Sequence, residues 1–323
     1  MAKNNNLHSA KRNKRDEFYT QLADIEKELM HYKAFFKGKV VYCNCDDARE
    51  SNFFKYFSMN FEHLGLKKLI STGYKENGKG VLLTYEGDKN GNRIVDNEEI
   101  VVTELNGNGD FRSEECIKFL KEADVVVTNP PFSLFREYVA QLMEYGKKFL
   151  IIGNQNAITY KEIFPYIKNE EMWMGLSMNG SNRWFQAPDD YEVKENAAGY
   201  KVIDGKKYYF VNGVAWFTNI PHNRRNQPLD LYKKYSNEYP KYDNYDAIEV
   251  SQVADIPMDY NGVMGVPITY LYKHCPTQFE ILGTSDRGGD GLMDYIKLNH
   301  TRFDAPVINN KGVYKRIFIK KII

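Results

Sequence analysis

The sequence lacks any apolar stretch close to the roughly 20 residues that a membrane-spanning helix needs. Its first 15 residues, MAKNNNLHSAKRNKR, also lack the apolar segment of a secretory signal. Both absences favour a cytoplasmic protein without a membrane partner. Hydrophobic residues nevertheless make up 42% of the 323 residues, which supplies a packed core and excludes a disordered chain.

Cysteine is scarce as well. The chain has four, Cys43, Cys45, Cys116 and Cys275, which are too few and too scattered for a disulfide framework. Cys43 and Cys45 are two isolated thiols on an expected strand and make a poor metal pair. We therefore expect buried thiols and no metal site.

An excess of charge of one sign is also missing, since 44 Lys and Arg face 43 Asp and Glu. A nucleic-acid partner would therefore need a local basic patch. The first 15 and the last 13 residues each hold five Lys or Arg and no acid. These ends are either solvated tails or arms that contact phosphates.

Strand and helix patterns alternate from residue 39 to 176. Apolar residues at steps of three and four predict an amphipathic helix over 16–36. The runs KVVYCNC, LKKLIST, DVVVTNPPF and KKFLIIG are typical of buried strands, and the Asn-Gly of KNGN predicts a hairpin turn. The alternation predicts an α/β fold with a parallel, doubly wound sheet, which binds ligands beyond the carboxyl ends of its strands.

The composition of the sequence changes after residue 176, where expected loops rich in Asn, Gly, Asp and Tyr predominate. We expect a basic arm over 1–15, a first domain over 16–176 and a smaller, less regular lobe over 177–323. Part of that lobe, about 206–220, is expected to return to the first sheet.

The strand VVVT is followed directly by Asn129, Pro130, Pro131 and Phe132. Two prolines end the strand and fix an extended backbone where an α/β sheet presents its ligands. The Asn129 side-chain oxygen and the Pro130 carbonyl can accept both hydrogens of an exocyclic amino group, while Phe132 offers a face for a base. This pattern favours catalysis by positioning a planar amine. A strand-ending loop with an aromatic plug is the alternative.

This element resembles the catalytic motif of the amino-group DNA methyltransferases that use S-adenosylmethionine. The segments DEFYTQ, VVYCNCDD, SNFFKYF, GDFRS, VVVTNPPFSLFREYV, KKFLIIGN, ITYKE, YPKYDNYDAI and DYNGVMGVPIT are similar to the EcoRI-type adenine-specific DNA methyltransferase family. The resemblance implies a Rossmann-like catalytic domain, a target-recognition lobe, and transfer of methyl to adenine N6 in double-stranded DNA, within a restriction-modification system.

The resemblance also implies cofactor contacts. Tyr19 and Thr20 match the N-terminal cofactor motif and would contact the methionine end, whereas Phe18 is more simply a core residue. Asp46 and Asp47 follow the first strand, where an acid can bind ribose hydroxyls or the ammonium group. A helix-capping pair is the alternative for these two acids.

One departure from the usual methyltransferase pattern affects the cofactor site. The Gly-x-Gly turn after the first strand is absent, and the second strand ends in Ser-Thr-Gly without an acid. Asp110 and Phe111 resemble the element that brackets the cofactor adenine, where Asp110 would accept from its amino group and Phe111 would cover the ring. A plain turn is the competing interpretation.

The implied mechanism requires adenine to be flipped out of the duplex, at a cost of about a few kcal/mol. Direct in-line transfer to N6 needs neither a metal nor a covalent intermediate. Trp216 or Phe217 could cover the second face of the base, although a core tryptophan is the alternative interpretation of Trp216.

Candidate contacts to DNA are Arg224, Arg225, Lys233, Lys234 and Lys241, each of which could instead lie on a solvated face. We expect a monomer that works alongside a cognate endonuclease without a stable complex. Methylation of RNA or of a protein glutamine by the same loop is an alternative, although protein-directed relatives usually carry Tyr in place of Phe132. A catalytically silent nucleic-acid-binding module is a further alternative.

Overall fold

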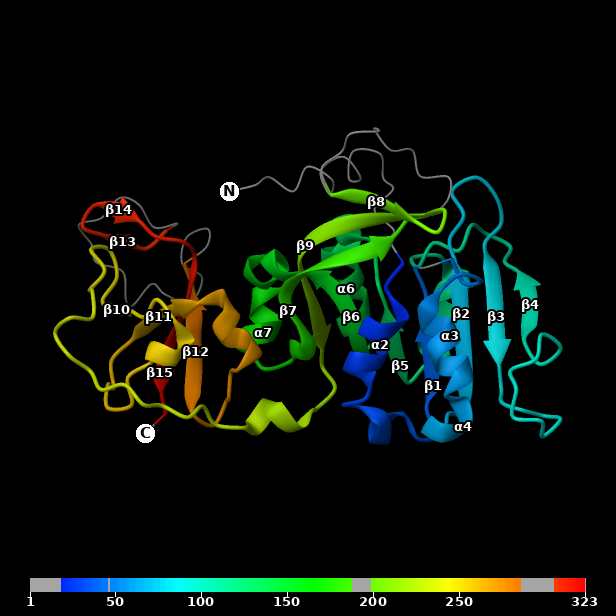
Figure 1. Ribbon diagram of the computed structural model, residues 1–323, viewed down its shortest axis with the longest axis horizontal. Helices are drawn as coiled ribbons and strands as arrows, with labels where there is room; N and C mark the ends of the chain where they lie inside the picture. Colours follow the sequence, from blue (N-terminus) through cyan, green and yellow to red (C-terminus); the bar gives the residue numbers. More distant parts are fainter. Residues whose placement is uncertain (1–18, 46, 188–198, 286–304, 323) are drawn as a thin grey trace. The chain divides into compact units, whose positions relative to one another are not determined.

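The computed structural model describes residues 19–45, 47–187, 199–285 and 305–322, and the chain divides into two compact units. Unit 1 comprises Met1–Gln155 and Gly175–Ile220, and unit 2 comprises Asn156–Met174 and Pro221–Ile323. The division differs from the boundary expected at residue 176, because strands that follow this position complete the sheet of unit 1 (Figure 1). The expected basic arm over 1–15 lies outside the described residues.

Unit 1 is built on a nine-stranded mixed sheet. Its strands follow the order β4-β3-β2-β1-β5-β6-β9-β7, and β8 pairs with β9 outside this path. The central strands β2, β1, β5 and β6 are parallel, whereas β2–β3, β3–β4, β6–β9 and β8–β9 pair in antiparallel fashion. The strands are β1 Val40–Cys43, β2 Lys68–Gly73, β3 Val81–Tyr85, β4 Val101–Glu104, β5 Val125–Thr128, β6 Lys148–Asn154, β7 Trp173–Gln186, β8 Tyr200–Ile203 and β9 Lys206–Thr218.

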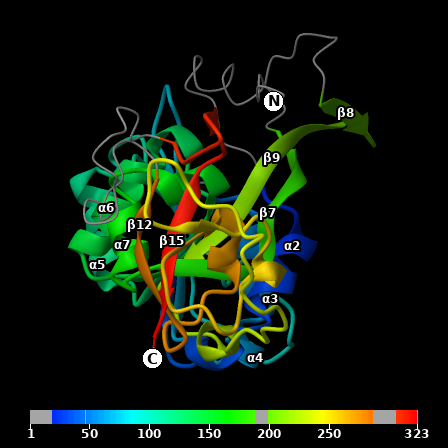
Figure 2. The ribbon, with the colours of Figure 1, turned by 90° about the vertical axis from the view of Figure 1, so that its left-hand side faces the viewer.

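The α/β class is therefore confirmed, with parallel pairing among the four central strands of the unit 1 sheet. Every residue of β1 and of β5 is buried, which is typical of parallel strands that are covered on both faces. Figure 2 shows helices α2 (Leu22–Leu29) and α3 (Asn52–Met59) on one face of this sheet and α5 (Glu114–Glu122) and α6 (Phe135–Glu144) on the other. The short helix α4 (Phe61–Leu64) follows α3. No helix in the described ranges is long and apolar enough to cross a membrane.

Two local expectations need correction. The amphipathic helix expected over 16–36 consists of α2 and a separate 3-10 turn, Lys33–Phe36, and its first residues lie outside the described ranges. The Asn-Gly of KNGN does not form a two-residue hairpin turn. The connection between β3 and β4 is longer because the Asp88 carboxylate accepts from the backbone N–H of Gly91 and of Arg93, at 2.6 Å each.

The less regular unit 2 contains a four-stranded sheet in the order β10-β11-β15-β12 and a small pair, β13 with β14. These elements are α7 Phe164–Lys168, β10 Ile248–Glu249, β11 Met264–Pro267, β12 Phe279–Thr284, β13 Val307–Ile308, β14 Lys311–Gly312 and β15 Arg316–Lys321. All four cysteines of the chain are buried, as expected.

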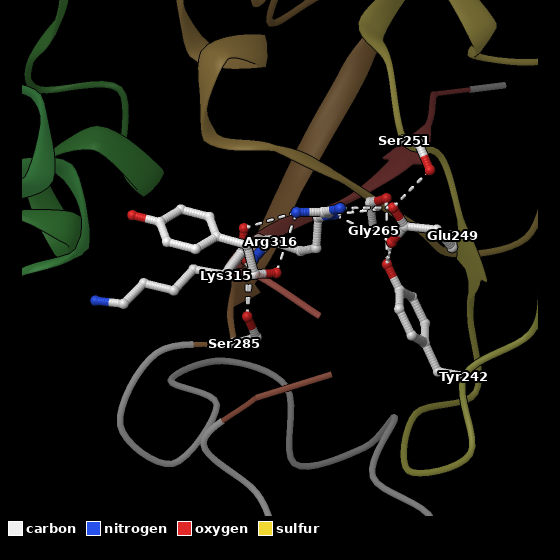
Figure 3. A network of polar contacts seen from close by, with 8 residues as sticks. Tyr242, Glu249, Ser251, Gly265, Ser285, Lys315 and Arg316 are labelled. Carbon is white, nitrogen blue, oxygen red and sulfur yellow. Dashed lines mark hydrogen bonds and ion pairs between the residues drawn. The ribbon is translucent and has the colours of Figure 1, made fainter. Parts of the chain in front are cut away.

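A buried ion pair joins two strands of unit 2 across β11 (Figure 3). Arg316 Nη2 on β15 lies 2.7 Å from Glu249 Oε1 on β10, and the Glu249 side chain is only 4% exposed. The Tyr242 hydroxyl also donates to Glu249, and burial, followed by the Glu249 charge, raises the Tyr242 pKa. Tyr242 therefore stays protonated as a donor, and the carboxylate is fully engaged.

A second buried carboxylate anchors β7 in unit 1. Glu28 of α2 is fully buried, and it accepts from Tyr32 Oη at 2.9 Å and from the backbone N–H groups of Leu176 and Ser177. A side chain at Gly175 would place its Cβ only 2.4 Å from Glu28 Oε1, so the close approach needs glycine. Glu28 thus fixes the point at which β7 joins the sheet.

Replacing Glu28 with alanine should lower the free energy of unfolding by about 3 kcal/mol, because two buried N–H donors and a buried hydroxyl lose their acceptor and each unsatisfied donor costs ~1–3 kcal/mol. Urea unfolding followed by far-UV circular dichroism measures this change. Glu26→Ala, on an exposed position of the same helix, is the matched control. Equal stability of the two variants would contradict the anchoring role of Glu28.

Candidate active site at the carboxyl ends of β1 and β5

The ends of two neighbouring parallel strands define the site. Val41 pairs with Val125 and Tyr42 with Val126, so the residues that follow β1 and β5 emerge side by side. The chain continues from β1 to β2 on one side and from β5 to β6 on the other. Such a switch in strand order opens a crevice for ligands at the carboxyl ends.

Asn129, Pro130, Pro131 and Phe132 lie at this switch point, as the sequence predicts. Asn129 is only 4% exposed, and Pro130 and Pro131 are buried. Pro131 has φ −54° and ψ 125°, so the chain stays extended before a 3-10 turn, Phe132–Leu134, leads into α6. Phe132 is half-buried and packs with one side against the main core. The loop is therefore rigid, and Phe132 keeps part of its surface accessible.

Asn44, the residue after β1, connects this loop to its neighbours. The Thr128 hydroxyl donates to the Asn44 carbonyl, and the Tyr138 hydroxyl on α6 donates to the Asn44 side chain. Tyr138 is fully buried, and burial raises its pKa well above the usual value, so the phenol stays protonated. These contacts tie β1, β5 and α6 together directly behind Asn129.

The turn after β1 forms without the usual glycines. Cys45 adopts φ 72°, a left-handed conformation that residues with side chains rarely take. Asp46 lies outside the described residues. Asp47 is exposed, and its carboxylate accepts from the Arg49 backbone N–H at 2.9 Å, whereas the cap of α3 is Ser51. Asp47 therefore closes the local turn, and its exposed side chain has acceptor capacity left for a ligand.

Tyr19 and Thr20 are held in an extended segment beside the sheet. Tyr19 forms an isolated bridge with Gln186 at the end of β7, and Asn52 Nδ2 donates to the Thr20 carbonyl at 2.7 Å. Thr20 is 1% exposed, and within the described ranges its hydroxyl has no hydrogen-bond partner. A buried hydroxyl of this kind costs free energy unless a ligand satisfies it, which fits a polar cofactor group.

Asp110 and Phe111 follow a close approach of two backbones at the end of β2. A Cβ on Gly109, which has φ 82°, would lie 2.3 Å from the Gly73 carbonyl oxygen. The ring of Phe111 meets the Tyr138 ring edge-on at 5.0 Å between centroids. The 110–111 loop, α6 and the end of β1 are thus joined through Tyr138.

Arg112 binds the Asp110 carboxylate through two hydrogen bonds, from Nε to Oδ1 at 2.9 Å and from Nη2 to Oδ2 at 2.6 Å. Its guanidinium lies over the Phe111 ring at 5.2 Å, and Nη1 reaches Glu137 of α6 at 3.3 Å. The hydrogen bonds from Arg112 lower the Asp110 pKa. Asp110 is therefore an ionised acceptor of fixed orientation, able to take a hydrogen from an amino group.

Three of the residues expected to contact DNA are placed in packed interiors. Trp216 and Phe217 are fully buried in β9, where Trp216 packs against Phe53 and Phe217 against Phe135. Neither can cover an extruded base, so the core interpretation of Trp216 is correct and extends to Phe217. Rings from helices on the two faces of the sheet bury them, because Phe53 belongs to α3 and Phe135 to α6.

Arg225 of unit 2 is also buried, at 8% exposure, and its guanidinium lies 4.8 Å over Trp173 and 3.6 Å from Glu170. These contacts lie within unit 2, and the burial of Arg225 argues against the expected contact to DNA. Arg224 and Lys241 are exposed. Exposure keeps these two available for a polyanionic partner.

Sequence reasoning missed Tyr138 and Arg112. Tyr138 occupies an ordinary apolar position of a helix, and its partner Asn44 is 94 residues away along the chain. Arg112 did have a signal, because it stands directly after the Asp110-Phe111 pair. An arginine two residues after an acid can fold back on it in a turn.

A model of the family described as "Adenine-specific methyltransferase EcoRI" matches residues 6–322. The chain belongs to this family. It is 50% identical to the type II methyltransferase M.EcoRI of Escherichia coli, over 99% of this chain and 97% of the relative. It is 41% identical to M.MpnI of Mycoplasma pneumoniae and 38% identical to M.MgeORF184P of Mycoplasma genitalium, over 98% of each chain in both cases. Methyltransferases of this fold generally use S-adenosylmethionine.

Replacing Arg112 with methionine should return the Asp110 pKa toward about 3.9, because the hydrogen bonds that favour the carboxylate are removed. A carboxyl pKa that is lower in the folded than in the unfolded state stabilises the protein above the unfolded pKa, and this stabilisation is lost as pH falls through the folded value. In the variant, the part of the stability that is lost as pH falls through the Asp110 pKa should be absent. A carboxyl ¹³C NMR titration measures the Asp110 pKa. An unshifted Asp110 in Arg112→Met, matching the control Arg49→Met, would contradict the pairing.

Proposed function

We propose that this chain transfers a methyl group from S-adenosylmethionine to N6 of a flipped adenine in a specific duplex DNA site, as the modification enzyme of a restriction-modification system. The observation that carries the proposal is the position of Asn129, Pro130, Pro131 and Phe132 at the switch point between β1 and β5. Family membership over nearly the whole chain agrees with it.

The residues around the switch point fit S-adenosylmethionine. The buried Thr20 hydroxyl would form a hydrogen bond with the methionine part of the cofactor. Asp47, in the turn after β1, would bind the ribose hydroxyls or the ammonium group. Asp110, held ionised by Arg112, would accept from the adenine amino group, and Phe111 would border the ring. When bound, the cofactor supplies an electrophilic methyl carbon.

The catalytic loop would hold the target amine. The Asn129 side-chain oxygen and the Pro130 carbonyl both accept hydrogen bonds and neither gives up a proton, so together they orient the two N6 hydrogens. The lone pair on N6 then points toward the methyl carbon, and positioning lowers the barrier. N6 loses a proton only after it has become cationic, so the loop needs no strong base.

Phe132 would hold the flipped base by stacking. Contacts between a base and an aromatic ring are worth ~1–3 kcal/mol, which offsets part of the cost of extrusion. Trp216 and Phe217 are excluded as the second face by their burial, so Phe132 is the aromatic contact that remains from the sequence expectation. Arg224 and Lys241 of unit 2, which we propose as the target-recognition unit, would contact phosphates or guanine. We also propose that the enzyme acts as a monomer without a stable complex with the endonuclease.

Asn129→Ala should reduce methyl transfer by about a hundredfold to a thousandfold, because one of the two acceptors that orient the amine is removed and a single preorganised hydrogen bond is worth ~10²–10³ in rate. Incorporation of tritiated methyl into duplex DNA measures the loss, and calorimetric titration should show nearly unchanged cofactor binding. Asn60→Ala, which loses only a local bond to the Tyr56 carbonyl, should retain parental activity. Parental activity in Asn129→Ala would refute the proposed function.

Phe132→Ala should weaken capture of the flipped base more than cofactor binding, by roughly tenfold, since a stacking contact of ~1–3 kcal/mol is lost. Fluorescence of 2-aminopurine at the target position reports extrusion. Phe35→Ala removes a second partly buried ring that packs on the same core, so it controls for lost packing. An undiminished fluorescence signal in Phe132→Ala would exclude the stacking role.

A further inference from the structure

The hairpin formed by β8 and the start of β9 exposes apolar side chains at its tip. Val202 is 54% exposed and Ile203 is 45% exposed. The turn residues Asp204 and Gly205 both have positive φ, 49° and 75°, which is the geometry of a tight hairpin turn that matches strand twist. Successive strand residues point to opposite faces, so the tip presents one exposed apolar side chain on each face of the hairpin. Exposed apolar side chains at the end of a well-formed hairpin favour a contact with another molecule.

Strand register places this hairpin beyond the carboxyl end of β6. β9 pairs with β6 from Thr218 to Val214, and β6 ends at Asn154 opposite Val214. The segment from Gly213 back to Lys206 therefore extends past the carboxyl end of β6, by roughly 23 Å at about 3.3 Å per residue. Figures 1 and 2 show β8 and β9 projecting beyond this end of the sheet.

The same edge carries Asn129. β5 lies next to β6 in parallel register, with Thr128 opposite Ile151, and β9 lies on the other side of β6. Two strand spacings of about 4.8 Å separate the catalytic loop sideways from the base of the hairpin. Along the strand axis the base of the hairpin lies three residues beyond the end of β5, or roughly 10 Å, since Thr128 is opposite Ile151 and Val214 is opposite Asn154. A duplex that delivers a base to Asn129 would therefore pass beside the hairpin.

Aromatic contacts stiffen the lower part of the hairpin. Trp184 of β7 packs against Phe210 of β9 at 5.1 Å, and Tyr200 packs against Tyr209 at 5.4 Å. The Lys201 ammonium lies 4.0 Å above the Trp184 ring. The tip is thus presented on a support that is built from packed rings.

Charge at the tip is complementary to DNA. Val202 pairs across the hairpin with Lys207, and Ile203 pairs with Lys206. Lys201 adds a third cation, and Asp204 is the one acid between Tyr200 and Tyr209. Apolar side chains flanked by lysines can press against base pairs while the ammonium groups bind phosphates.

We propose that Val202 and Ile203 form a wedge that enters the duplex beside the target adenine and helps to unstack it, while Lys206 and Lys207 bind the flanking phosphates. The inference rests on the proposed function and adds the element that drives base extrusion. Apolar wedges of this kind are a general means of opening base steps. The catalytic loop then captures a base that the hairpin has already loosened.

The test is the double variant Val202→Ser with Ile203→Ser. On a matched duplex, its methylation rate and its 2-aminopurine signal should fall about tenfold or more, because the unstacking cost of a few kcal/mol is no longer offset. On a duplex with a mismatch at the target adenine, where extrusion costs less, its rate should return to near the parental rate. Calorimetric titration should show unchanged cofactor binding, and thermal unfolding should match the parent.

The matched control is Val101→Ser with Val102→Ser, on the edge strand β4, where the two valines are 54% and 52% exposed. This control should methylate at the parental rate. Equal rates for the tip variant and the control on the matched duplex would overturn the wedge, as would failure of the mismatch to rescue the tip variant. Absence of methylation by the parent itself would instead refute the proposed function.

Discussion

The hydrogen bonds that converge on Asn44 are the constraint on which the rest of unit 1 depends. The backbone carbonyl of Asn44 fixes the end of β5 through Thr128, and its side chain fixes α6 through Tyr138. The catalytic loop lies between these two attachments in sequence, so neither of its ends can move independently. Because Tyr138 also packs against Phe111, the same phenol aligns the loop that would border the cofactor. In the proposed function, one buried point would thus set the positions of both substrate and cofactor.

Much of this edge of the sheet could be predicted from the sequence, because its signals are local. A valine run that stops at two prolines predicts both the strand and the rigid corner, and Asn129 and Phe132 lie where that pattern places them. The burial of Trp216, Phe217 and Arg225 could not be predicted, because it depends on which helices and rings become neighbours. AWFTN and RRN contain no sign that Phe53 of α3 and Phe135 of α6 cover β9, or that Trp173 lies under a guanidinium. Tyr138 acts through Asn44, which is 94 residues away, and a periodic pattern cannot report such a contact. Arg112 binds the nearby Asp110, so its role did have a local signal.

The two units use buried carboxylates in the same way. Glu28 holds β7 through backbone N–H groups, whereas Glu249 is held by Arg316 and Tyr242. A buried charge is tolerated only where its hydrogen bonds are complete. In unit 2, where regular strands are short, this requirement links β10 directly to β15, although the two strands lie on opposite sides of β11 and do not pair with each other. Although the sequence after residue 220 shows few regular helix or strand patterns, buried polar contacts still define the structure of this unit.

The left-handed conformation of Cys45 has a consequence for assembly. A glycine would populate this shape before the chain folds, but a residue with a side chain avoids it by roughly 1–2 kcal/mol. The bend after β1 is therefore sparsely populated until the neighbouring strands impose it. If this turn holds the nucleoside part of the cofactor, as proposed, a nascent or partly opened chain would bind the cofactor weakly until the central strands have formed.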